Sequence, residues 1–262
     1  MLEVHPPHQA AHTWRDFFIH IATICVGLLI AIGLEQCVEA VHHHHQREDL
    51  ERQMHVESVQ NLDLVGAQIR FAAERRDYLN ACVRALQAAT PSGGQLVVTL
   101  PVNNVSFPAS SQGLLISPSR GTWTIAQAAG TVALLPPEKA KVYARLDLTA
   151  DFERQAEMET SRTAALLATA RLQDHAATAD GHPLRLTQAE VDDLLHAFGA
   201  AREAAADFHF RLVVLKGSLE AVVANVDTLQ QMYPYQIRAI SQEGAEAAAS
   251  RARDVSNSAP QP

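Results

Sequence analysis

The chain has 262 residues, 29 of them acidic and 21 basic, and its formal net charge is -8. Nucleic acids select a basic protein face, so this composition argues against a nucleic-acid partner. Only 5% of the residues are aromatic, and alanine is abundant. This balance favours long helices over sheets, and the three cysteines are too few for a disulfide framework.

Residues 1–16 are predicted to form a short cytoplasmic tail. The stretch contains Pro6 and Pro7 and has no apolar period. Trp14 and Arg15 then stand where an interfacial aromatic residue and a cytoplasmic positive charge are expected beside a membrane span. We therefore expect the N-terminus on the cytoplasmic side, with the long remainder of the chain across the membrane.

Residues 17–34 form an uncharged apolar run, which is long enough to cross the hydrocarbon core of a bilayer as a helix. The sequence predicts a single transmembrane helix here. A cleaved signal peptide is the alternative, because Ala31 and Gly33 are small residues suitably placed for cleavage after Gly33. The run is long for a signal peptide and has one basic residue before it, which favours the anchor.

Three small residues, Thr23, Gly27 and Ala31, recur at every fourth position of this run. They share one face of the predicted helix, and small residues on one face let transmembrane helices approach each other closely. We consider them candidates for packing between two anchors. The alternative is that they reflect only the ordinary Gly and Ala content of an apolar segment.

A long helix is predicted to continue from Glu35 to about Ala88, because apolar residues follow steps of three and four from Leu62 to Leu86. Residues 91–94, Pro-Ser-Gly-Gly, end it. Residues 91–135 then form an irregular segment with a β-prone run at 96–100 and a short helix at 122–129, closed by Gly130.

This irregular segment is too apolar to be merely disordered, and two interpretations of it stay open. Its large side chains could plug the open end of a helical bundle. Alternatively, some of them stay exposed as a contact surface for a partner. The candidate contact residues are Trp123, Leu115 and Ile116, with Trp123 as the anchor because tryptophan is enriched among binding hot spots.

Two further long helices are predicted. The first starts at Pro136-Pro137-Glu138 and runs to about Thr178, and the second opens with the capping box Thr187-x-x-Glu190. The second helix carries an unbroken alternation of three and four up to Tyr233, which is typical of a heptad seam, and Pro234 ends or kinks it. The seam comprises Val191, Leu194, Phe198, Ala201, Ala205, Phe208, Leu212, Leu215, Leu219, Val222, Val226, Leu229 and Tyr233.

The predicted fold class is all-α. An N-terminal transmembrane helix continues into an antiparallel, coiled-coil-like bundle of three long helices that occupies residues 35–243. Residues 244–262 are expected to be a flexible C-terminal tail because they are polar and Ala-rich. In this arrangement residues 91–135 lie at the end farthest from the membrane, and residues 179–186 lie near it.

Two parts of the sequence resemble a family of uncharacterised bacterial single-pass inner-membrane proteins. They are residues 14–31, from Trp14-Arg15-Asp16 to Ile30-Ala31, and residues 117–136, with Ser117-x-Ser119, Trp123-x-x-Ala126-x-x-x-Gly130 and Leu135-Pro136. The resemblance covers the anchor and the segment 113–146, and it implies an inner-membrane anchor with an extracytoplasmic helical domain, but no activity. Arg145-Leu146-Asp147 departs from the family pattern, in which an aromatic residue follows the leucine.

The sequence contains no motif of a known catalytic or phosphate-binding site, so we expect neither an enzyme nor a cofactor. His42, His43, His44 and His45 follow the anchor, and His-rich tracts can bind metal loosely. Glu39-x-x-His42 resembles one arm of a carboxylate-bridged metal site, but the facing helices lack the other ligands. A solvated patch beside the lipid headgroups is therefore the favoured interpretation, with no metal ligand assigned.

The leading functional hypothesis is a membrane-anchored, periplasmic scaffold or interaction protein. Its expected partners are the lipid bilayer, a second copy through the anchor, or an unidentified envelope protein. The alternative is a sensor-like helical bundle that binds a ligand. A cytoplasmic tail of about 16 residues is short for a signalling output, which favours the scaffold.

Overall fold

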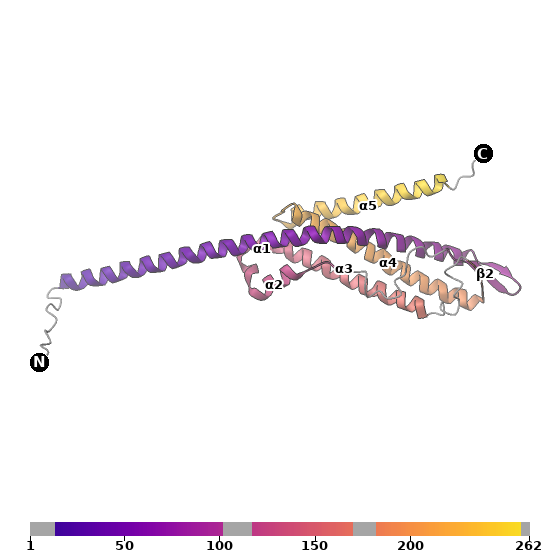
Figure 1. Ribbon diagram of the computed structural model, residues 1–262, viewed down its shortest axis with the longest axis horizontal. Helices are drawn as coiled ribbons and strands as arrows, with labels where there is room; N and C mark the ends of the chain where they lie inside the picture. Colours follow the sequence, from indigo (N-terminus) through magenta and orange to yellow (C-terminus); the bar gives the residue numbers. More distant parts are fainter. Residues whose placement is uncertain (1–13, 102–116, 170–181, 258–262) are drawn as a thin grey trace. The chain divides into compact units, whose positions relative to one another are not determined.

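The computed structural model describes residues 14–101, 117–169 and 182–257. The chain divides into two compact units, residues 1–49 and residues 50–262. Helix α1 (Trp14–Gln87) contributes to both of them, and Figure 1 shows the order of the elements along the chain. The predicted all-α class is confirmed, and the strands form only a small three-stranded sheet.

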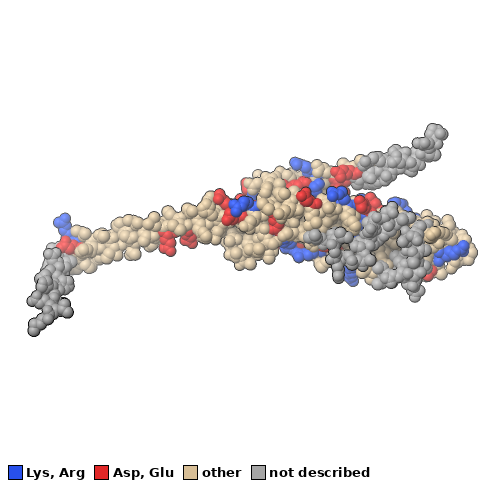
Figure 2. All heavy atoms as spheres, viewed as in Figure 1, with Lys and Arg blue, Asp and Glu red and all other residues tan. Residues whose placement is uncertain are grey.

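In the first unit, α1 carries the apolar run. By length and composition it is the one helix in the described part of the chain that could cross a membrane, and none of its apolar stretch is buried in the structure. No charged residue lies between Asp16 and Glu35 in the sequence, and Figure 2 shows a long uncharged stretch on the visible face of this helix. A helix whose apolar side chains face outward on all sides has the surface expected of a segment in lipid.

The second unit is built from the rest of α1 and from four shorter helices: α2 (Gly121–Ala129), α3 (Pro137–Thr169), α4 (Gln188–Val223) and α5 (Leu229–Asn257). A one-turn 3₁₀ helix, η1 (Thr131–Leu134), follows α2. Three sequence predictions are confirmed here. The short helix ends at Gly130 with φ 75°, the second long helix begins at Pro137, and Thr187 and Glu190 form the capping box of α4.

The direction of α3 differs from the prediction. Residues 50–72 of α1 share one core cluster with α2, the first half of α3 and the end of α4, whereas residues 79–86 pack with Leu167 and the start of α4. Helix α3 therefore runs in the same direction as α1 rather than opposite to it. Two helices that run in the same direction need a long connection between them, as in bundles that contain a crossover connection.

The same packing corrects the predicted position of residues 179–186. Strand β3 (Pro183–Leu186) pairs with β2 (Gln95–Thr99), which follows α1, so this segment lies at the end of the bundle where α1 finishes. Strands β1 (Thr90–Ser92) and β2 form a hairpin whose two-residue turn is Gly93-Gly94, both with positive φ. Such turns match the twist of paired strands and require residues that tolerate positive φ.

The last predicted helix is divided in two. Helix α4 ends at Val223, Asn225 takes a left-handed conformation with φ 56°, and α5 begins at Leu229. Pro234 lies inside α5 and does not end it, and α5 continues to Asn257 through most of the predicted tail. The ten seam positions that lie within α4, from Val191 to Val222, are all buried as predicted, whereas Tyr233 on α5 is exposed.

Helices α4 and α5 approach closely at Gly217. A Cβ atom at this position would lie 2.6 Å from Cα of Gln236 and 2.9 Å from the backbone oxygen of Tyr235. Beside it, the side-chain amide of Gln236 donates to Oγ of Ser218 at 2.7 Å in the buried interface. The absence of a side chain at residue 217 therefore sets the distance between the two backbones.

Gly217→Ala should destabilise the bundle by about 1 to 3 kcal/mol, because backbone atoms of α5 must shift to admit the methyl group. Gly199→Ala is the matched control on the same helix. Its Cβ would meet nothing within 4 Å, so it should be neutral or gain up to about 1 kcal/mol from helix propensity. Denaturant unfolding of both variants measures the difference, and equal stabilities would contradict the close α4–α5 contact.

Candidate functional site

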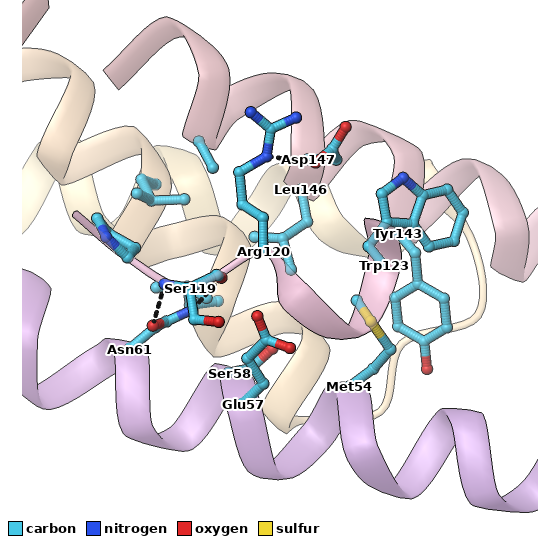
Figure 3. A pocket seen from close by; sticks show the side chains of 14 residues that line it. Met54, Glu57, Ser58, Asn61, Ser119, Arg120, Trp123, Tyr143, Leu146 and Asp147 are labelled. Carbon is cyan, nitrogen blue, oxygen red and sulfur yellow. Dashed lines mark hydrogen bonds and ion pairs between the residues drawn. The ribbon is translucent and has the colours of Figure 1, made fainter. Parts of the chain in front are cut away.

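Residues 117–120 are held against α1 by hydrogen bonds between the side chain of Asn61 and the backbone of Ser119 (Figure 3). The side-chain amide of Asn61 donates to the backbone oxygen of Ser119 and accepts from its N–H, both at 2.9 Å. The side chain of Asn61 thus binds both the N–H and the C=O group of Ser119, which fixes the position of the segment on α1. Glu57 adds a third bond, because its Oε2 accepts from the N–H of Thr122 at 2.8 Å.

The bond from Glu57 replaces a helix cap. Arg120 is the N-cap residue of α2, and its side chain makes no capping hydrogen bond. The first N–H groups of a helix need an acceptor from elsewhere, and a negative charge is favourable at this end. Here α1 supplies both through Glu57, so the position of α2 depends on a residue 65 positions earlier in the chain.

The side chain of Arg120 instead joins the segment to α3. Its Nε donates to Oδ1 of Asp147 at 2.6 Å and its Nη1 donates to Oδ1 of Asp151 at 3.0 Å. These hydrogen bonds, first of all the one to Asp147, raise the pKa of the guanidinium. Asp147 and Asp151 of α3 thus form ion pairs with the segment that precedes α2.

A small cavity of about 20 Å³ lies beneath this segment. Figure 3 shows its lining from α1, α2 and α3. This volume is about that of one water molecule and far below that of a small-molecule site. Its lining comprises Met54, Glu57, Ser58, Asn61, Pro118, Ser119, Arg120, Trp123, Tyr143, Leu146, Asp147, Ala150, Leu215 and Leu219. The cavity is therefore too small for a ligand. The residues around it form a contact region between helices, which is called the joint.

Trp123 is a core residue in this joint. Its side chain is 4% exposed, and its ring centroid lies 6.1 Å from that of the buried Tyr143. The burial of Trp123 corrects the expectation that it anchors a partner at the surface. Its position also corrects the predicted plug, because Trp123 packs beside Leu50 and Met54, where α1 enters the bundle, and not at the end where α1 finishes. Ile125, two residues later on α2, is 69% exposed. Leu115 and Ile116 lie outside the described residues, so their contact role stays a prediction.

Trp123→Ala should cost about 3 to 5 kcal/mol of unfolding free energy, because it removes a large buried side chain from the joint. Ile125→Ala is its control on the same helix and should change stability by less than about 0.5 kcal/mol, as an exposed substitution does. Chemical denaturation followed by circular dichroism measures both values. A Trp123→Ala variant as stable as the parent would show that the joint does not depend on the indole.

In the apolar run of α1, the candidate packing residues Thr23, Gly27 and Ala31 are all exposed. The hydroxyl of Thr23 donates to the backbone oxygen of Ile19 at 2.8 Å, so its polar group is satisfied within the helix. A Cβ at Gly27 would meet nothing within 4 Å. The face is therefore open, and packing of a second anchor against it stays a prediction.

The four histidines next to the anchor are exposed and interact only with near neighbours on α1. His44 Nε2 lies 3.1 Å from a carboxylate oxygen of Glu48, and His42 shares a hydrogen bond of 2.9 Å with Gln46. Across residues 14–101, 117–169 and 182–257, no three His, Cys, Asp or Glu side chains form a group that could hold a metal ion.

Glu153 is a buried carboxylate on α3 that the sequence patterns did not indicate. It is 1% exposed, and neither of its side-chain oxygens has a hydrogen-bond partner. Burial, and then the negative charge of Glu157, raises its pKa from an ordinary 4.5 to about 7. The folded protein therefore favours the neutral acid at pH values where an unfolded chain carries the charge.

This raised pKa predicts a loss of stability as the pH rises. Below about pH 4.5 the group is protonated in both states and adds no penalty. Between pH 4.5 and about 7 the unfolded chain loses its proton and the folded chain keeps it, so the free energy of unfolding falls with pH. The full difference corresponds to about 3 kcal/mol at 1.4 kcal/mol per pH unit.

Glu153→Gln should remove this fall and make the protein more stable than the parent above pH 7. Urea unfolding at intervals from pH 4.5 to 8 measures it. Glu157→Gln removes only the second cause of the shift, so it should reduce the fall without abolishing it. An unchanged pH dependence in Glu153→Gln would show that the carboxylate is hydrated in solution.

A second buried titratable group lies between three helices. Nε2 of His209 on α4 is 2.9 Å from a carboxylate oxygen of Glu243 on α5, although the two are not aligned as a hydrogen bond. Nδ1 of His209 faces Arg76 of α1 at 3.5 Å. Burial lowers the pKa of His209 against the opposing attraction of Glu243. The pair lines neither the small cavity nor the groove between α3, α4 and α5 described below.

Comparison with known proteins identifies no relative: no family model, no curated protein and no solved structure matches the chain.

The site residues that the sequence did not reveal are Asn61, Arg120, Asp147 and Glu153. Asn61 and Glu153 are polar residues within apolar stripes, which is the one signal that singles them out.

Proposed function

We propose that this protein is a membrane-anchored scaffold or interaction protein whose helical bundle lies outside the cytoplasm of a bacterium. The observation that carries the proposal is the composition of α1. One helix contains both an exposed apolar run long enough for a bilayer and, from Leu50 onward, the first core stripe of the bundle. The helix thus combines the surface expected of a membrane anchor with that of a domain core.

The proposed orientation rests on charge. Arg15 directly precedes the apolar run, and positive residues are retained on the cytoplasmic side. The proposed location is therefore the inner membrane, with a cytoplasmic N-terminus and a periplasmic bundle. The proposed partners are the bilayer, a second copy through Thr23, Gly27 and Ala31, and an envelope protein that contacts the bundle.

The proposal includes no enzymatic activity. The pair of His209 and Glu243 is mostly buried between helices. The small cavity has room for about one water molecule, so no substrate fits beside its polar residues. These features support a protein that acts through its surface.

A bifunctional label on Ile125 tests both the location and the interaction. In the full-length chain with Cys25, Cys37 and Cys82 changed to alanine, Ile125→Cys places one thiol on the exposed face of α2. A membrane-impermeant maleimide that carries a photoreactive diazirine is added to intact cells with a permeabilised outer membrane. We expect labelling at this position and, after illumination, reproducible crosslinks to an envelope protein or to a second copy.

Gln9→Cys in the same background is the matched control. It should stay unlabelled until the inner membrane is broken, because residues 1–16 are proposed to be cytoplasmic. Labelling of Gln9→Cys but not of Ile125→Cys in intact cells would refute the orientation. Labelled Ile125→Cys without any intermolecular crosslink, repeated from a second exposed position such as Met158→Cys, would refute the scaffold function.

A further inference from the structure

A second hollow lies between α3, α4 and α5, and it is called the α3–α5 groove here. Its volume is about 400 Å³, within the range of small-molecule binding sites. It is lined by Arg145, Thr149 and Phe152 of α3, by Phe210, Arg211 and Val214 of α4, and by Tyr233, Gln236, Ile237 and Ile240 of α5.

The walls of the α3–α5 groove are apolar and exposed. Phe210 is 51% exposed and Ile237 is 63% exposed, and Phe152, Tyr233 and Ile240 are also exposed. Single apolar side chains at a surface are ordinary, but here three helices direct theirs into one hollow. Removal of such surface from water is favourable, so the groove suits a ligand with an apolar body.

The charged side chains that line the groove are all positive. Its lining contains two arginines and no acidic residue, in a chain whose formal net charge is -8. Arg211 is already paired, because its Nε donates to Asp207 at 2.8 Å and its guanidinium lies 5.4 Å from the centre of the Phe152 ring. The acidic partner of Arg211 lies outside the lining of the groove.

Arg145 provides the remaining positive charge. Its Nε is fully buried and has no hydrogen-bond partner, and no described carboxylate forms an ion pair with it. A guanidinium in such surroundings lacks the acceptor that a buried donor normally has. Carboxylate and phosphate oxygens are the acceptors that arginine binds best.

The length of the groove limits its occupant. The lining extends over residues 145–152 of α3 and 233–240 of α5, which is about 10 Å at 1.5 Å per residue. Two helical turns are short for a docked protein helix, whose apolar contacts extend along a longer groove. The combination of a short apolar hollow and one unpaired arginine fits a small molecule better.

We propose that the α3–α5 groove binds a small anionic amphiphile, with its carboxylate or phosphate group at Arg145 and its apolar chain against Phe210 and Ile237. The amphiphile is either free in solution or a phospholipid of the bilayer, since both present the same chemistry. This inference goes beyond the proposed scaffold function and does not depend on a protein partner. A ligand here would also favour the sensor-like alternative.

The test uses the full-length protein in nanodiscs of phosphatidylcholine and a diazirine derivative of decanoic acid as the probe. After illumination, peptide mapping should place the label on groove residues of α3, α4 or α5. Unlabelled decanoate should compete, whereas decanol and decyltrimethylammonium should compete at least about tenfold more weakly, because they lack the anionic group. Nanodiscs that contain phosphatidylglycerol distinguish the source: loss of labelling there assigns the groove to lipid, and retained labelling assigns it to a free amphiphile.

Arg145→Gln should weaken decanoate binding by about tenfold or more and leave decanol unaffected. Ile237→Gln should weaken both, and because Ile237 is exposed this variant should fold normally. Arg154→Gln is the matched control, since Arg154 lies on α3 but outside the groove and pairs with Asp151. It should bind decanoate as the parent does.

Equal binding of decanol and decanoate, or unchanged binding by Arg145→Gln, would overturn the proposal. Labelling spread over the surface outside the groove would overturn it as well. A concentration-dependent dimer that Ile237→Gln disrupts, without specific probe binding, would assign the groove to a second copy instead and would also overturn it.

Discussion

The buried ammonium group of Lys139 determines the arrangement of the C-terminal half of the bundle. It is 3% exposed and donates to Oδ1 of Asn225, the backbone oxygen of Val226 and Oδ1 of Asp227 at 2.7, 2.9 and 3.1 Å. A buried charge is costly without such partners, so the turn after α4 must stay where the ammonium group can reach it. This turn folds α5 back onto α4, Gly217 lets the backbones meet, and the α3–α5 groove results from both.

The turn held by Lys139 is also where prediction from the sequence was wrong. The apolar alternation passes through Val226 without interruption, because residues after the turn still pack on the same core. Apolar residues therefore stay buried at the same spacing through the turn, although the helix itself is interrupted there. The local signal was Thr228-x-x-Gln231, a capping box: Thr228 Oγ1 accepts from the Gln231 N–H at 3.3 Å, and Gln231 Oε1 accepts from the Thr228 N–H at 3.2 Å. A local capping box is thus stronger evidence for the start of a helix than an apolar period is for the continuation of the preceding one.

The features that the sequence predicted correctly depend on short-range physics: the uncharged run, the capping box of α4, the left-handed Gly130 and the buried seam within α4. The direction of α3 depends instead on contacts between distant residues. The Asn61–Ser119 pair spans 58 positions and the pairing of β2 with β3 spans more than 80. A single sequence does not show which polar side chain will meet which backbone group, so the burial of Trp123 was weighed correctly as one alternative, but its partners and its end of the bundle were not predicted.

Helix α3 shows why polar core residues matter for function in this fold. Several of its buried positions are polar: Lys139, Thr149, Glu153, Thr160 and Thr163. The hydroxyls of Thr149 and Thr163 donate to their own helix, at 2.7 and 3.0 Å, and therefore add little adhesion to other helices. Hydrogen bonds of Lys139 and of Asp147 with Arg120 hold α3 in position, whereas ionisation of the uncompensated Glu153 opposes its burial. The same helix presents Arg145 to the groove. A proton at Glu153 or an anion at Arg145 therefore acts on a helix that also contributes to the main core of the bundle.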